Sequence, residues 1–150
     1  MKVIRFLSLY LTALALGPAL AHLLELPNKV GLSREDYLTV QQIYRGWALL
    51  GIVIFGSLIS TLILTIMLRK KGRAFTLTLI ALLCIAASQV VFWTFTFPAN
   101  QATNNWTYLP ANWLELRQEW EYSHATGAGL WLIAMAALIL SVLPRDEPVK

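Results

Sequence analysis

The sequence predicts an all-α integral membrane protein, a four-helix bundle whose second and fourth helices extend beyond the bilayer on the outer side. Of its residues, 57% are hydrophobic and 13% are charged, a composition unlike that of a soluble globular domain. The apolar residues gather into four segments, each long enough to cross a hydrocarbon core of about 30 Å as a helix. We therefore expect a single membrane domain, with spans at residues 3–25, 46–68, 74–97 and 125–143.

The first apolar segment has no charge after Arg5 until its end, where Pro27 and Gly31 interrupt the helical pattern. A basic start, an apolar stretch and the tripeptide Ala-Leu-Ala at residues 19–21 also match a cleavable signal peptide, with cleavage after that tripeptide. We favour a retained helix, because the apolar run continues through Leu24.

The second helix is predicted to be longer than the bilayer is thick. Ser33 is a suitable N-cap, and Glu35 and Asp36 place acidic side chains in the first turn, where the helix dipole favours them. The pattern then stays helical to Leu68, over roughly 50 Å at about 1.5 Å per residue. The start of this helix should therefore protrude on the outer side.

The third and fourth helices are delimited by prolines. The third is predicted to end at Pro98, followed by a loop at residues 99–109 that is rich in Asn, Gln and Thr. The fourth begins near Pro110 and is closed by Pro144. Its first part, residues 111–123, is amphipathic and should project outward as an extension of the last span.

Basic residues determine the expected orientation, since Lys and Arg accumulate in cytoplasmic loops. The short loop between the second and third spans is strongly basic, which predicts a multi-pass protein of the cell or inner membrane with both termini cytoplasmic. The net charge of +4 then reflects topology and contact with the lipid bilayer, and no nucleic-acid partner is expected. A homo-oligomer is left open. The residues expected on the cytoplasmic side are Lys2, Arg5, Arg69, Lys70, Lys71, Arg73, Arg145 and Lys150.

The two histidines of the chain each lie one helical turn from a glutamate. His22 precedes Glu25 by three residues, and His124 follows Glu121 by three. Residues three apart share one face of a helix, so each pair directs an imidazole and a carboxylate the same way. Both pairs lie at the outer ends of apolar segments, where charged groups are costly and often functional.

Other polar and aromatic side chains belong to the same outer half of the bundle. The third helix contributes Gln89 and Trp93. A structural interpretation stays open, in which the glutamates pair with Lys29, Arg45 or Arg117 to fasten helix ends and the tryptophans anchor the protein at the membrane interface. On the fourth helix, one stripe carries Trp113, Arg117, Trp120, Glu121 and His124.

Three functional interpretations are also open. In a minority hypothesis, His22, Glu25, Glu121 and His124 bind a metal ion. In a second, the two histidines are axial ligands of a haem. In the third, which needs no cofactor, a histidine oriented by a carboxylate is the general base of a small-molecule pocket. Tryptophans would stack on a flat aromatic substrate there, and amides such as Asn100 would bind its oxygens.

The final third of the chain carries an ordered set of residues: Pro98, Ala99, Asn100, Asn112, Trp113, Arg117, Trp120, Glu121 and His124. This set resembles the anthrone oxygenase-like family of small four-helix membrane proteins, and the resemblance covers residues 97–140. The chain departs from the family pattern at Gly127, where that pattern has an arginine.

The resemblance implies oxidation of an anthrone to an anthraquinone by molecular oxygen, with no cofactor and with His124 as the base. Such chemistry agrees with the pocket interpretation, because deprotonation at the benzylic carbon gives a carbanion that reacts with oxygen directly. A non-enzymatic protein that binds lipid or quinone, or an accessory membrane protein, remains the alternative. The expected catalytic residues are His124, Glu121 and Arg117, and the expected substrate-binding residues are Trp120, Trp113, Asn100, Asn112, Gln89 and Trp93.

Overall fold

The computed structural model describes residues 1–144 of the chain, which are helical and contain no β-strand. Four helices in this range are long and apolar enough to cross a membrane: Lys2–Lys29, Trp47–Met67, Arg73–Ala102 and Trp113–Val142. The predicted all-helical class and the four apolar helices are thus confirmed. Arg145 and Lys150, which were expected on the cytoplasmic side, lie outside the described residues.

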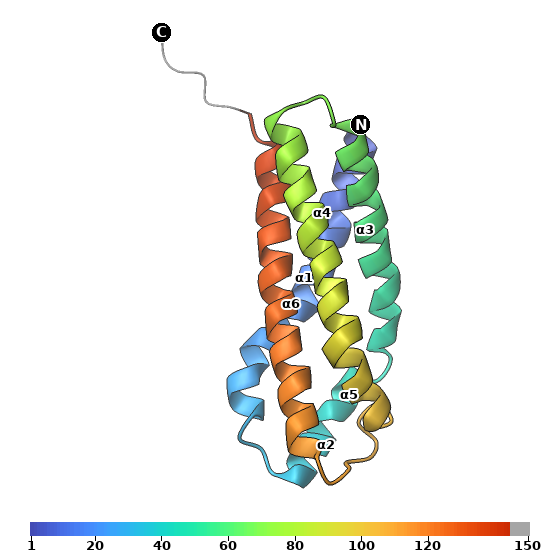
Figure 1. Cartoon of the computed structure of the whole chain (residues 1–150), viewed down its shortest axis with the longest axis vertical. Coiled ribbons are helices and arrows are strands. Elements are labelled where there is room, and N and C mark those ends of the chain that lie inside the picture. The colour runs from blue at the N-terminus through green and yellow to red at the C-terminus, as the bar shows by residue number, and fades with distance from the viewer. Residues whose placement is uncertain (145–150) are drawn as a thin grey trace.

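Four long helices run side by side along the molecule (Figure 1). They are α1 (Lys2–Lys29), α3 (Leu50–Met67), α4 (Arg73–Val91) and α6 (Trp113–Val142). Helix α1 packs against α3 and α6, and α4 packs against the same two helices. The N-terminus and the α3–α4 loop lie at one end, and the shorter segments gather at the other (Figure 1). We call those shorter segments, residues 30–49 and 97–112, the cap.

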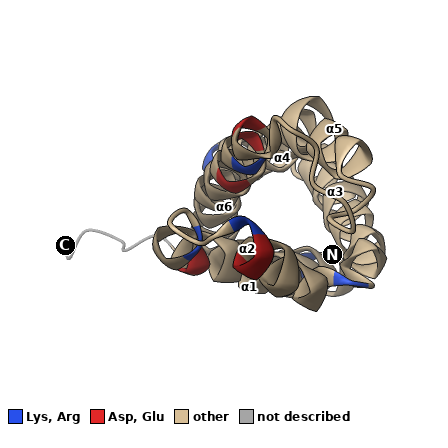
Figure 2. Ribbon diagram, turned by 90° about the horizontal axis from the view of Figure 1, so that it is seen from below, with Lys and Arg blue, Asp and Glu red and all other residues tan. Residues whose placement is uncertain are grey.

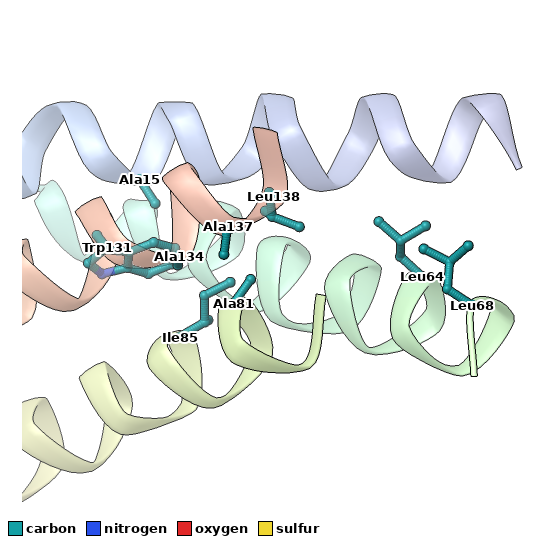
Figure 3. Close-up of a cluster of buried hydrophobic side chains, with 9 residues drawn as sticks. All are labelled: Ala15, Leu64, Leu68, Ala81, Ile85, Trp131, Ala134, Ala137 and Leu138. Carbon is teal, nitrogen blue, oxygen red and sulfur yellow. The ribbon is translucent and has the colours of Figure 1, made fainter. Parts of the chain in front are cut away.

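The half of the bundle away from the cap has an apolar core. In Figure 3, Trp131 and Ala134 of α6 lie beside Ala81 and Ile85 of α4, and all four are buried. Small residues at such interfaces let membrane helices approach closely. The hydroxyls of the buried Thr12 and Ser57 join α1 to α3 at 2.7 Å, which satisfies groups that lipid could not.

The expectation that one helix runs from residue 33 to 68 is wrong. Ser33 caps a short helix, α2 (Arg34–Gln41), and accepts a hydrogen bond from the Asp36 amide as predicted. Two short 3₁₀ turns, η1 (Gln42–Tyr44) and η2 (Trp47–Leu49), then separate α2 from α3. Between them Gly46 has φ +88°, a left-handed conformation that glycine adopts without penalty and that ends a right-handed helix.

Two predicted helix ends are also corrected. Helix α1 passes through Pro27 to Lys29, and the Val30 amide still donates to the Leu26 carbonyl at 3.1 Å. The third span does not stop at Pro98: α4 continues as a π-helix, η3 (Phe92–Thr96), and then as α5 (Phe97–Ala102). Pro98 lies in the first turn of α5, where a missing amide hydrogen costs little.

The fourth helix is continuous, as predicted. Helix α6 runs from Trp113 to Val142 without a break, a length of about 45 Å at 1.5 Å per residue. It therefore joins the polar cap to the apolar core as a single rigid element. The side chains of its first turns and those of its apolar part are therefore held at fixed positions relative to each other.

Candidate functional site

A cavity of about 710 Å³ extends from the cap into the bundle between the four long helices. Its volume lies within the range of pockets that hold drug-sized ligands. Alanines and Pro18 line its deeper part, and amide and imidazole side chains line the part nearest the cap. Its aromatic lining residues are His22, Tyr44, Trp47, Phe55, Phe92, Trp93, Phe97, Trp106, Trp120, His124 and Trp131.

The imidazoles of His22 and His124 are in contact inside this cavity, with ring centroids 4.1 Å apart. They come from α1 and α6, which pack directly on each other. Trp120 lies against both, at 5.0 Å from His22 and 4.0 Å from His124. Tyr44 and Trp47 cover the other side of His22 at 4.7 and 5.4 Å. The break at residue 46 lets the chain turn so that these two side chains reach the histidine.

Hydrogen bonding gives the two imidazoles different roles. The Nδ1 atom of His124 lies 2.8 Å from the carbonyl oxygen of Trp120. A carbonyl can only accept, so Nδ1 carries the proton and Nε2 of a neutral imidazole carries the lone pair. The Nδ1 atom of His22 is buried and has no hydrogen-bond partner among residues 1–144. A buried polar atom without a partner is costly.

Behind the Trp120 wall, Lys29 and Glu121 form a buried ion pair. Their Nζ and Oε1 atoms are 3.0 Å apart, and the two side chains are 4% and 0% exposed. The Lys29 ammonium also lies 4.5 Å from the centre of the Trp120 ring and 4.6 Å from that of Tyr44. Aromatic faces attract a cation electrostatically. Trp120 thus contacts both this charge pair and the two histidines.

Two tyrosines of the cap complete the polar network. The Tyr37 hydroxyl donates to Glu121 Oε1 at 2.9 Å, and Gln41 donates to Tyr37 at 2.7 Å. Burial raises the pKa of Tyr37, and the Glu121 carboxylate raises it further. The Tyr44 hydroxyl donates to Glu25 and accepts from Lys29. Burial and the Glu25 contact raise the pKa of Tyr44 in the same direction.

Asn100 connects the cap loop to α6. Its Oδ1 accepts hydrogen bonds from the indole N–H groups of Trp106 and Trp120, both at 2.9 Å. Trp106 has φ +59°, a strained conformation for a residue with a large side chain. It is held there by its bond to Asn100, by the Thr103 hydroxyl on its amide and by Gln42 on its carbonyl. Asn100 therefore orients the tryptophan that packs on both histidines.

The structure brings together about half of the predicted site residues. His22, Gln89, Trp93, Asn100, Trp120 and His124 line the cavity, whereas Glu25, Asn112, Trp113, Arg117 and Glu121 do not. The Arg117 guanidinium packs on Trp113 at 4.8 Å and donates to the Leu32 carbonyl at 3.0 Å. Asn112 is exposed and immediately precedes α6.

The proposed metal and haem sites are not assembled in this arrangement. Within residues 1–144 there is no group of three or more His, Cys, Asp and Glu side chains that could hold a metal ion. Glu25 and Glu121 are engaged by Lys29 and the two tyrosines instead. An axial imidazole nitrogen lies about 2 Å from its metal, so a haem cannot fit between rings that already touch.

Tyr44 and Trp47 were not among the expected site residues. Lys29 was expected only in the structural interpretation, as a partner of the glutamates, and the structure shows that pairing with Glu25 and Glu121. The spacing of Lys29 from Glu25 was visible in the sequence, but its burial depends on α1 continuing past Pro27. Tyr44 and Trp47 reach His22 because the helix is interrupted at Gly46, between them. The sequence pattern was interpreted as one continuous helix, which would not bring both side chains to this histidine. The glycine between these two aromatic residues was the sequence feature that could have indicated an interruption of the helix.

Comparison with known proteins finds no matching family model, no matching curated protein and no matching solved structure. Function is therefore argued from the geometry of the cavity.

Proposed function

We propose that this chain is a multi-pass membrane protein that binds a hydrophobic aromatic or quinone-type molecule in the cavity and oxidises it with molecular oxygen, without a cofactor. The observation that carries the proposal is the contact between His22 and His124 inside a large aromatic cavity. Two imidazoles there supply a base beside aromatic surfaces on which a flat ligand can stack.

The placement of charge supports a cap on the outer side of the membrane. The basic loop at residues 69–73 lies at the end of the bundle opposite the cap (Figure 1), and such loops remain cytoplasmic. Acidic residues occur on α1, α2 and α6 towards the cap, as the view from that end shows (Figure 2). The two histidines then lie near the outer membrane surface.

The lining of the cavity suggests how a ligand lies in it. Gln41, Gln42 and Asn100 line the part nearest the cap, and Ala15, Ala128 and other apolar residues line the deeper part. A molecule with oxygens at one end and a hydrocarbon body would place the oxygens towards the cap. Trp47 and Trp120 offer large flat surfaces beside the histidines, which suits a planar aromatic ring.

An anthrone is the substrate class that the sequence resemblance implies, and its chemistry suits this site. The base removes a proton from the benzylic carbon, and the resulting carbanion gives an electron to oxygen and then forms a carbon–oxygen bond. The peroxide anion takes the proton back from the imidazolium, and the resulting hydroperoxide loses water to leave a carbonyl. One anthrone and one oxygen molecule thus give one anthraquinone and one water. No external reductant is required.

His124 is the proposed base, since the Trp120 carbonyl holds its Nδ1–H and leaves Nε2 to accept a proton. His22 packs on the His124 ring and also lines the cavity. Glu121 holds Lys29 in an ion pair, and Arg117 packs on Trp113 and Tyr37. Both residues belong to α6 and act as positioning residues, because neither lines the cavity. Asn100 orients Trp120 and faces the cavity.

The test uses full-length protein reconstituted in vesicles, with anthrone as the probe. Oxygen uptake and anthraquinone absorbance are followed at neutral pH for the wild type, His124→Gln, His22→Gln and the exposed control Glu119→Gln. Loss of a general base typically costs a hundredfold or more, so we expect His124→Gln to lower kcat by about 10²-fold. Glu119→Gln should match the wild type.

Binding is measured in parallel by quenching of tryptophan fluorescence with 2-ethylanthraquinone, a product analogue. Quenching without oxygen uptake by the wild type would contradict the oxygenase and identify a non-enzymatic binding protein. Absence of both would contradict the pocket itself. Equal oxygen uptake by the wild type and His124→Gln would remove the proposed base.

A further inference from the structure

We infer that the cavity opens sideways to the bilayer between α3 and η3, and that its hydrophobic ligand enters through this opening from the hydrocarbon phase. This inference rests on the proposed binding function and adds the route and the physical state of the ligand. We call the opening, flanked by Phe55 of α3 and Trp93 of η3, the lateral portal.

Phe55 and Trp93 combine two properties. Both line the cavity, and yet Phe55 is 48% exposed and Trp93 is 51% exposed. A large side chain that borders an internal cavity and is also half exposed lies at a mouth of that cavity. Phe55 belongs to α3, and Trp93 belongs to η3, which continues α4, the helix that packs on α3. We therefore assign them to the two sides of one opening.

The opposite wall is closed. The cavity residues of α1 and α6 include Ala15, His22, Trp120 and Trp131, which are 6%, 7%, 3% and 5% exposed. Ala128 of α6 is 0% exposed. A ligand therefore cannot pass between α1 and α6 without separating packed helices. Outside the cap, Phe55 and Trp93 are the two lining residues that are exposed, which places the opening on the side of α3 and η3.

The portal side of the molecule is chemically suited to lipid. Residues 47–68 and 74–112 contain no Asp, Glu, Lys or Arg, so α3, α5 and the whole of α4 after Arg73 are uncharged. A mouth in this face opens onto acyl chains, where a hydrophobic aromatic molecule concentrates. The ligand class is thus a bilayer-dissolved planar aromatic molecule.

A second mouth at the cap differs in chemistry. Arg45, Gly46, Asn105 and Thr107 also line the cavity and are exposed. They belong to polar cap segments, where water and charged molecules have access. The cavity therefore has an apolar portal for the hydrophobic ligand and a polar mouth for water-soluble species.

The portal is built on a π-helix. Residues 92–96 form η3, and this widened turn displays Trp93 at the mouth; π-helical turns occur frequently at functional sites. The Thr96 hydroxyl lies 2.6 Å from that of Ser123, the residue before His124. The side of the portal formed by η3 is thus tied to the turn of α6 that carries the proposed base.

The experiment compares the portal with matched positions on the same helices. Phe55→Cys and Trp93→Cys are made in a Cys84→Ala background, and each is coupled to benzophenone maleimide. The controls are Ile52→Cys on α3 and Val90→Cys on α4, which are 75% and 66% exposed and do not line the cavity. Unlabelled forms and thermal unfolding check that each variant is folded.

Two probes distinguish the two mouths in vesicle-reconstituted protein. Stopped-flow quenching of tryptophan fluorescence follows binding of 2-ethylanthraquinone, which partitions into the bilayer, and of anthraquinone-2-sulfonate, which is charged. We expect the labels at 55 and 93 to slow binding of the first probe about tenfold relative to the unlabelled form of the same variant. Binding of the sulfonate should keep its rate. Labels at 52 and 90 should change neither.

The failures are distinguishable. Normal quenching with unchanged rates at both portal positions would overturn the portal and leave the proposed function standing. Equal slowing of both probes would also overturn it, because a charged probe does not travel through lipid. Absence of quenching in the unlabelled wild type would overturn the proposed function together with the portal. Phe55→Trp, which adds bulk without a label, should reproduce the slowing.

Discussion

Lys29 of α1 and Glu121 of α6 form a buried ion pair, with 3.0 Å between Nζ and Oε1. Tyr37 donates to the same carboxylate oxygen at 2.9 Å. Within residues 1–144, Glu121 forms no ion pair with Arg117 and no hydrogen bond with His124, the two partners that local spacing on the helix suggests. The pair joins α1, α2 and α6 at the cap, directly behind the aromatic wall of the cavity.

Removing one partner of this pair should be strongly destabilising. Glu121→Gln removes the nearer of the two carboxylates beside the buried Lys29 and leaves only Glu25, at 3.8 Å. Removing one partner of a buried ion pair costs about 3–5 kcal/mol. The free energy of unfolding in mixed micelles measures this. Glu119→Gln, on the exposed face of the same helix, should change it by less than about 0.5 kcal/mol. A double variant, Lys29→Met with Glu121→Leu, should recover most of the loss; additive losses would contradict the pairing.

The side-chain oxygen of Asn100 should be required for the stability of the folded protein. Asn100→Leu leaves two buried indole N–H groups without their partner, at about 1–3 kcal/mol for each. Asn100→Asp keeps an oxygen in place and should retain more stability than Asn100→Leu. Thermal unfolding monitored by tryptophan fluorescence compares them with Asn112→Leu, which alters an exposed residue with no capping hydrogen bond. Equal loss at positions 100 and 112 would refute this role.

Tyr37 should resist ionisation in the folded protein. Burial and the Glu121 carboxylate raise its pKa, whereas a tyrosine in the unfolded chain ionises near pH 10. The protonated form is therefore favoured by folding, and the stability linked to it is present below about pH 10 and is lost as pH rises further. Tyr37→Phe should lose less stability between about pH 9 and pH 11 than the wild type.

Absorbance at the tyrosinate band supplies the direct readout for Tyr37. Of the five tyrosines, one fewer ionises in denatured Tyr37→Phe than in denatured wild type. In the folded proteins the two absorbance changes up to about pH 11 should be equal. A difference of one tyrosine between the folded proteins would show that Tyr37 titrates normally.

Gly46 should tolerate a side chain poorly for conformational reasons alone. A Cβ at this position meets nothing within 4 Å, but φ is +88°, which costs an L-residue about 1–2 kcal/mol. Gly46→Ala should lower stability by that amount. Gly17→Ala, also in open space but inside α1, should raise stability by up to about 1 kcal/mol. The same sign for both substitutions would contradict the left-handed turn.

Local patterns in the sequence were sufficient for the existence of the four apolar helices, but not for the ends of the first and third or for the break at Gly46. Long apolar segments must satisfy their backbone groups internally and therefore become helices, and Ser33 with its acidic neighbours predicts the start of α2. The same patterns placed His22 and His124 at one end of the bundle. Gly46 was not recognised as a break, because glycine permits a left-handed turn without requiring one.

The sequence by itself determined that the chain is helical, that four helices are apolar enough to cross a membrane, and that both histidines lie towards one end. Only the tertiary structure decided that His22 and His124 touch and that Glu121 pairs with Lys29. The physical reason is that partners on different helices depend on how far each helix is shifted and rotated relative to its neighbour. That register is set by packing along the whole length of α1 and α6, and no local spacing contains it.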